Sequence, residues 1–408
     1  MIPTHNYADY VGGAIRSGLE QGYAPVEIIA VDDGSTDATS AVLRSFGSAI
    51  HTLRLERHGV SAARNAGLAA SRGTYVVFLD ADDLLLPGGV SAQVAHLERR
   101  PDVDAVAGDW YVCDVETRSA RRERTTLGTD DALARLLRGN AFSTPSAVML
   151  RRSALEAVGG FDRRFAFTAD WELWLRLARH GRRFSAVPAA VAMYRVHGRS
   201  MTRDIAHAIP DTIAFLDHCF ADSGLSATTR AMEPRTRYSI MMYLARLGLI
   251  QSDDRWAREC VQRALGWNPA ALDSFAFYDA LVYALSQERR PTRDDHAERI
   301  LALAHGGEPT APEPAPRKAM RHLAAGAVAR HRRDWKGALR SLGAALRASP
   351  RTALQRPQRR LALLLPVPPG MLHALRRALA VVGMYPRSDP DARAILHAVL
   401  AAESKRDS

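Results

Sequence analysis

Two short apolar runs that each end abruptly in acidic residues constrain the fold most strongly. The run 26–31 ends in Asp32-Asp33-Gly34, and the run 74–79 ends in Asp80-Ala81-Asp82-Asp83. Short apolar runs bounded by turn residues predict buried strands, and the helical stretches between them predict βαβ units. We therefore expect an α/β fold with a mainly parallel sheet. Ligands bind such sheets at the carboxyl ends of the strands, where both acidic clusters fall.

Helix signals separate these strands. Ser35-Thr36-Asp37 predicts the start of a helix that reaches Phe46, and Pro87 suits the first turn of a helix toward Arg99. A third strand is expected at 103–107. Strands and helices thus alternate as far as about residue 204, and this part is predicted to form one domain, 1–204.

Beyond residue 204 the chain is rich in Ala, Leu and Arg and is predicted to be all helical. The stretch 306–316, with four prolines and two glycines, predicts a linker between a helical region, 205–305, and a basic helical region, 317–408. A repeat at an offset of 81 resembles a tetratricopeptide hairpin, and a generic helical bundle is the alternative. The matched residues are Ala245, Ala257, Ala264 and Pro269 with Gly326, Ala338, Ala345 and Pro350.

The positive charge of the chain lies at its C-terminal end. Residues 311–408 hold 19 Lys and Arg against 6 Asp and Glu, whereas the rest holds 36 against 38. This asymmetry indicates an anionic partner, such as an acidic membrane face, or a solvated basic surface. The apolar segments 361–369 and 371–382, with Arg376 and Arg377, predict either an interfacial helix or a buried hairpin. Nucleic acid is a weaker prediction, because aromatic residues are not interleaved with the basic ones.

Composition excludes several classes of protein. Of the 408 residues 47% are hydrophobic and 24% charged, which excludes a wholly disordered chain. Three scattered cysteines do not make a disulfide framework, so a reducing compartment is expected. No signal-peptide pattern and no membrane-spanning apolar run are found. We expect a cytoplasmic protein that contacts the inner membrane face peripherally.

The carboxylates of Asp80 and Asp82 predict a metal site. Alternate residues of an extended chain project to the same side, so the two carboxylates would meet and repel unless a cation lay between them. A hard divalent ion, Mn²⁺ or Mg²⁺, fits oxygen ligands and leaves positions for phosphate oxygens. An acidic helix cap is the alternative.

Three further clusters carry polar groups at expected strand or helix ends. Asp33, at a strand exit, is suited to bind a ribose hydroxyl or a nucleobase imide. The run 59–67 combines small residues with Arg64, which can pair with phosphate. Asp170 stands at the start of a helix that carries Trp171 and Arg176, and it is either a positioned base or a cap.

Taken in order, these motifs resemble the family 2 glycosyltransferases of the GT-A fold. The resemblance spans about the first 200 residues and says little about the rest. The matching stretches are 2–7, Ser17 with Gln21, 27–37, 59–67, 78–83, 159–162, 170–176 and 194–197.

The resemblance implies roles for individual residues. Pro3, Thr4, Asn6 and Asp33 would contact the base and ribose of a nucleotide, and Arg64 would help to hold it. Asp80 and Asp82 match the Asp-x-Asp motif, with Asp80 near the ribose and Asp82 on a divalent metal, Mn²⁺ or Mg²⁺. Asp170 matches the catalytic base. His197 stands where a late metal or phosphate contact is often found, with a structural role as the alternative.

The acceptor is expected to bind near residues 103–142. Asp109 and Trp110 lie in this region, and Trp171 and Arg176 are further acceptor-side candidates. The sequence departs from the family pattern because few residues precede Pro3, so the first strand is expected to be nearly missing, and because Ala169 replaces a usual Glu before Asp170.

These residues predict an inverting, metal-dependent transferase. It would move one sugar from a nucleotide-diphosphate sugar to a hydroxyl of a cell-surface glycan or a lipid-linked precursor, with Asp170 taking the proton. The absence of membrane-spanning segments argues against a processive synthase. The main rival is a helical-repeat interaction protein with a truncated, inactive transferase domain. A nucleotidyltransferase is disfavoured because no glycine-rich loop follows Pro3.

Overall fold

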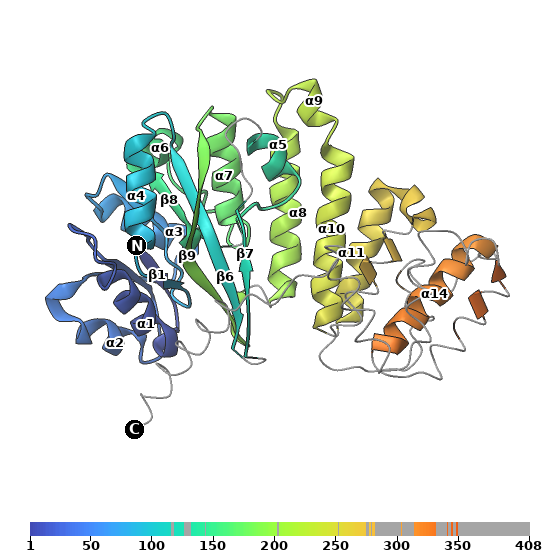
Figure 1. Cartoon of the computed structure of the whole chain (residues 1–408), viewed down its shortest axis with the longest axis horizontal. Helices are drawn as coiled ribbons and strands as arrows, with labels where there is room; N and C mark the ends of the chain where they lie inside the picture. The colour runs from blue at the N-terminus through green and yellow to red at the C-terminus, as the bar shows by residue number, and fades with distance from the viewer. Residues whose placement is uncertain are drawn as a thin grey trace. The chain divides into compact units, whose positions relative to one another are not determined.

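The computed structural model of the chain shows two compact units (Figure 1). Their described residues fall within 1–221 and 222–387. The structure describes residues 1–115, 118–125, 132–142, 144–201, 204–251, 253–274, 277–278, 280–281, 303, 314–331, 341, 344–345 and 348–349.

The first unit begins with a three-stranded parallel sheet, β1 (Ile2–Thr4), β2 (Ile29–Asp33) and β3 (His51–Leu55), in that order. Ala30 of β2 packs with α1 (Ala8–Leu19) and α2 (Thr39–Ser45), and its neighbours Ile29 and Val31 pack with Ala63 of α3 (Val60–Ala70). Strand side chains alternate between faces, so these helices cover both sides of β2.

The first strand forms despite its short length. All three residues of β1 are buried, and Met1 extends the pairing toward the second sheet. Its amino group donates to the carbonyl of Val77 at 2.8 Å, and its carbonyl accepts from Leu79 N at 2.9 Å. The strand that was expected to be nearly missing is therefore present, with three residues.

The second sheet is mixed. Its order is β4 (Tyr75–Val77), β8 (Val148–Arg151), β6 (Ala105–Asp114), β9 (Phe184–Val196) and β5 (Leu84–Leu85), and β7 (Ser119–Glu123) also pairs with β6. Among the strands that the structure describes here, β6 and β9 pair in parallel, and the other pairs are antiparallel. The prediction of a mainly parallel sheet is correct for β1–β3 and wrong here. The short connection from β6 to β7, for example, permits only an antiparallel pair.

Helices and short turns complete the first unit. The helix α4 (Gly89–Arg99) packs on the second sheet, in a core cluster that contains Val94, Trp110 and Val112. The remaining elements are η1 (Gly47–Ala49), α5 (Ala132–Leu137), η2 (Pro145–Ala147), α6 (Arg152–Val158), α7 (Ala169–Arg179) and α8 (Ile205–Ala221). The first unit thus includes α8 and extends beyond the boundary expected at residue 204.

The regular elements that the structure describes in the second unit are all helices, as predicted. It contains α9 (Ala227–Arg230), α10 (Glu233–Ile250), α11 (Asp254–Trp267), η4 (Pro269–Asp273) and α14 (Ala315–His331). Gly248 lets α10 approach α11 closely, because a Cβ there would lie 3.0 Å from Ala257 N. Among the described residues no helix is both long and apolar enough to cross a membrane.

Two predictions for this half stay untested. The first member of the proposed repeat is the α10–α11 hairpin, in which Ala245, Ala257 and Ala264 are buried. Ala338 and Pro350 of the second member lie outside the described residues, as do the basic segment 351–408 and residues 304–313 of the expected linker. The helix α14 begins at Ala315, within that expected linker.

Candidate active site

Asp80 lies in the turn between β4 and β5, at an edge of the sheet. Arg64 Nη2 donates to its Oδ1 at 2.7 Å, and its own N–H donates to Ser146 Oγ at 3.1 Å. Its side chain is 25% exposed. Burial raises the pKa of Asp80 to about 6; Arg64 opposes this rise, and the nearby carboxylates of Asp82 and Asp170 add to it.

Asp82 faces His197, which the sequence places 115 residues away. Asp82 Oδ2 and His197 Nε2 are 3.1 Å apart, and both side chains are largely buried. The ring of His197 stacks on Tyr10 with centroids 4.2 Å apart, which fixes its plane. The structure therefore brings together the two residues that were predicted to bind a metal.

The donors at this point fit a divalent cation. A carboxylate oxygen and an imidazole nitrogen are both ligands of Mn²⁺. The backbone N–H of Arg199 donates to His197 Nδ1 at 3.2 Å, which leaves the proton of a neutral ring on Nε2, directed at Asp82. Binding of a cation by Nε2 would require that proton to move.

Asp83 anchors the acidic turn from within the protein. It is fully buried and accepts hydrogen bonds from Thr144 Oγ1 at 2.6 Å, Ser146 Oγ at 2.7 Å and Arg195 N at 3.2 Å. Burial raises its pKa well above the ordinary value, and the neighbouring Asp82 adds to this.

Arg64 links the acidic turn to the candidate base. It is buried on α3, and its guanidinium lies over the ring of Phe161, 5.1 Å from the centroid. Its charge opposes the raised pKa of both Asp80 and Asp170. The predicted residues Arg64, Asp80 and Asp170 thus belong to one electrostatic cluster.

Asp170 lies in the first turn of α7 and is buried. Its Oδ1 accepts from Trp171 N at 2.7 Å, and its Oδ2 accepts from Asn140 Nδ2 at 3.1 Å. Burial raises its pKa, while Arg64 and Asn140 oppose this rise. A raised pKa makes a carboxylate a stronger base. Asn140 was missed, because an asparagine in a loop resembles an ordinary turn residue.

The loop after β1 is held by hydrogen bonds to the loop after β2. Asn6 has a φ of 57°, which asparagine tolerates better than most residues. Its Oδ1 accepts from Thr36 N at 2.8 Å, and its N–H donates to Ser35 Oγ at 2.9 Å. Pro3 and Thr4 are buried in β1, and Thr4 Oγ1 has no hydrogen-bond partner within the described part of the chain.

Asp33 shapes the turn that leads into α3. Its two carboxylate oxygens accept from the N–H groups of His58 and Gly59, each at 2.7 Å. Gly59 has a φ of 90°, a conformation that glycine adopts without strain. Asp33 thereby positions the start of the helix that carries Arg64.

The four acceptor-side candidates make contacts within the protein. Trp110 is 4% exposed in the core cluster of α4, so it does not line an open face. Asp109 accepts from Arg122 Nη2 and Thr125 N, both at 2.9 Å. Trp171 Nε1 donates to Leu136 O at 2.8 Å, and Arg176 pairs with Glu172 at 2.8 Å. These side chains hold the framework around the site.

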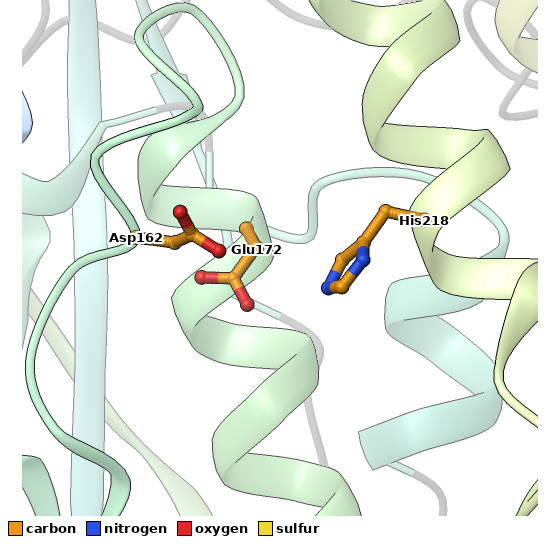
Figure 2. A group of neighbouring side chains, drawn as sticks. All are labelled: Asp162, Glu172 and His218. Carbon is orange, nitrogen blue, oxygen red and sulfur yellow. The ribbon is translucent and has the colours of Figure 1, made fainter.

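A second group of potential metal ligands lies where α7 meets α8. Figure 2 shows Asp162, Glu172 and His218 facing one another, and their ligand atoms lie within 4.8 Å. Arg164 Nη2 lies 2.5 Å from Asp162, and Arg176 Nε lies 2.8 Å from Glu172. The arginines already supply the positive charge, so we do not assign a metal to this group.

Comparison with known proteins identifies the family of the chain. Residues 1–159 match the family described as glycosyl transferase family 2. An uncharacterized glycosyltransferase of Nostoc sp. is 30% identical over 222 residues, which cover 51% of this chain and 67% of the relative. One of Rickettsia prowazekii is 29% identical over 189 residues, 44% of this chain and 58% of the relative. The chain belongs to glycosyltransferase family 2.

The chain is also similar to a solved structure. The mannosyltransferase PcManGT from Pyrobaculum calidifontis, in complex with GDP-Man and Mn²⁺, is 19% identical to this chain. The alignment covers 87% of this chain and 86% of that one, with a TM-score of 0.46.

Proposed function

We propose that the first unit is an inverting, metal-dependent glycosyltransferase. The donor would be a nucleotide-diphosphate sugar, and the acceptor a hydroxyl of a cell-surface glycan or a lipid-linked precursor. One observation carries the proposal: Arg64 donates to Asp80, in the acidic turn, at 2.7 Å, and its charge also opposes the raised pKa of Asp170, at the start of α7. The residues proposed to bind the donor, Arg64 and Asp80, thus belong to the same electrostatic cluster as the proposed base, Asp170.

Different residues would bind the nucleotide, hold the donor and bind the metal. Pro3, Thr4 and Asp33 lie at the carboxyl edge of β1 and β2, where the base and ribose would bind. Arg64 and Asp80 would hold the donor beside Asp170. Asp82 and His197 would hold Mn²⁺ or Mg²⁺, which neutralises the charge on the departing diphosphate when bound.

Asp170 would act as the general base. Its buried carboxylate would accept the proton of the acceptor hydroxyl as the oxygen attacks the anomeric carbon. The bond to the diphosphate breaks as the new glycosidic bond forms. A single displacement without a protein nucleophile inverts the configuration at that carbon, so an α-linked donor would give a β-linked product.

Buried like charges support activity over a purely structural role. Asp80, Asp82 and Asp83 lie within one turn, and burial, with the charge of Asp82 adding to it, raises the pKa of Asp80 and Asp83. Such a cluster costs stability, so a structural turn would not require it. We also propose that the protein is cytoplasmic and that its basic segment 311–408 contacts the acidic inner face of the membrane.

Release of nucleotide diphosphate tests the proposal. Purified full-length chain is incubated with a panel of sugar nucleotides and Mn²⁺ or Mg²⁺, because slow hydrolysis reports the donor before the acceptor is known. We expect metal-dependent release from one donor class. Failure of every donor, with or without candidate acceptors, would favour the inactive, interaction-protein alternative.

A further inference from the structure

The segment that leads into α7 is held by residues of two other helices, α3 and α8. Residues 165–168 are separated from Asp170 by Ala169 alone, and their polar groups bond to two different helices. Ser61 Oγ of α3 donates to Phe165 O at 2.6 Å. On the other side the segment meets Asp211 of α8, which lies beyond residue 159, where the family match ends.

Asp211 accepts three hydrogen bonds from this segment. Ala166 N donates to its Oδ1 at 2.9 Å, and Thr168 N and Oγ1 donate to its Oδ2 at 2.9 Å and 2.6 Å. Thr168 is the N-cap residue of α7, yet its own side chain makes no capping bond to the helix. The carboxylate of Asp211 therefore holds the N-cap residue itself and not the free N–H groups of the first turn, and its negative charge suits the start of a helix.

Aromatic packing fixes α8 against the same elements. The ring of Phe215, one turn after Asp211, lies 4.7 Å from the ring of Trp171 and 5.9 Å from that of Phe165. Phe215 is fully buried. The position of Asp211 relative to Asp170 is thus set by a packed interface and not by a mobile side chain.

We propose that Asp211 is a positioning residue that fixes where the carboxylate of Asp170 lies relative to Arg64. This inference rests on the proposed function. Ser61 and Arg64 lie one turn apart on α3, so the segment 165–168 connects that helix to Asp170 on one side and to α8 on the other. Asp211 itself touches no reacting atom. A misplacement of a base by about 1 Å lowers turnover about a hundredfold.

The test compares Asp211→Ala with Asp204→Ala in the full-length chain. Asp204 is exposed and bonds His207 at the start of α8, so its loss weakens the same helix without touching residues 165–168. We expect Asp211→Ala to lower kcat about tenfold to a hundredfold, with the donor KM changed less than about twofold. Asp204→Ala should keep the turnover of the wild type.

A double variant separates positioning from general loss of structure. If Asp211 acts through Asp170, then adding Asp211→Ala to Asp170→Asn should lower the residual rate no further. An undiminished kcat in Asp211→Ala, or an equal further loss in the Asp170→Asn background, would overturn the inference. If Asp211→Ala does not fold, Thr168→Val, which removes one of the three bonds, should show the same pattern with a smaller loss.

Hydrogen exchange tests whether Asp211 holds the segment 165–168, and this measurement does not depend on enzyme activity. The amides of Ala166 and Thr168 should exchange faster in Asp211→Ala than in the wild type, while those of β2 stay unchanged. Equal exchange in the two proteins would refute positioning by Asp211. An inactive wild type would instead count against the proposed function, so the two failures are distinguishable.

Discussion

The carboxylate of Asp80 should cost the folded protein stability at neutral pH. Burial raises its pKa to about 6 from an ordinary value of 3.8, and each unit corresponds to about 1.4 kcal/mol. Ionised Asp80 therefore destabilises the folded state by about 3 kcal/mol. Asp80→Asn removes the charge and keeps an oxygen that can accept the hydrogen bond from Arg64. The variant should raise the free energy of unfolding by about this amount.

The gain should depend on pH in a defined direction. The folded state binds the proton of Asp80 more tightly than the unfolded state does, so the cost is fully present above the folded pKa and disappears as the pH falls below about 4. Asp80→Asn should thus gain about 3 kcal/mol near pH 7.5 and about half of this near pH 5.

Urea denaturation in the presence of a chelator measures both values, because a bound cation would neutralise the site. Asp162→Asn is the matched control. Its side-chain hydrogen bond from Arg164 lowers the pKa of Asp162, so that carboxylate stabilises the folded state at neutral pH, and its neutralisation should destabilise the protein. A loss of stability in Asp80→Asn near pH 7.5, or a gain that is the same at both pH values, would refute the reasoning.

Three further predictions concern the surroundings of the site. Asn140→Leu removes a hydrogen bond that favours the ionised form of Asp170, so the pKa of this carboxyl should rise and the acidic limb of the kcat profile should move to higher pH. An unmoved limb would contradict the assigned contact. Trp171→Phe retains ring packing but loses the bond to Leu136 O, and urea denaturation should show a loss of about 1 kcal/mol. Asp82→Asn should raise the Mn²⁺ concentration needed for half-maximal diphosphate release about tenfold or more, whereas an unchanged requirement would remove Asp82 from the metal site.

The sequence predicts the parts of the fold that depend on local pattern. Residues 28–31 before Asp32 are buried, as are Val76, Phe78 and Leu79 before Asp80, as expected for strands that end in polar residues. The convergence of Arg64 with Asp80 also follows, because helices and strand ends of such units meet at one edge. The antiparallel pairs of β8 with β4 and β6 depend on the paths of distant segments, and no local signal reports them.

Residues that act across long separations could not be read from the sequence. Asn140 and Asp211 bond to the segment of Asp170 over 30 and 43 residues, and neither stands in a recognisable motif. The burial of Trp110 could not be read from the sequence for a different reason. Side chains alternate along β6, so Trp110 and Val112 both turn toward the core of α4, and only the start of this strand had been predicted.

Transfer by Asp170→Asn, measured with the donor identified by diphosphate release, tests the central claim most directly. Asparagine has nearly the same shape as aspartate and cannot accept the proton. The rate of sugar transfer should fall at least about a thousandfold, while the donor affinity, measured by calorimetry with Mn²⁺, stays within about threefold. A variant that transfers sugar at the rate of the wild type would show that Asp170 is not the base.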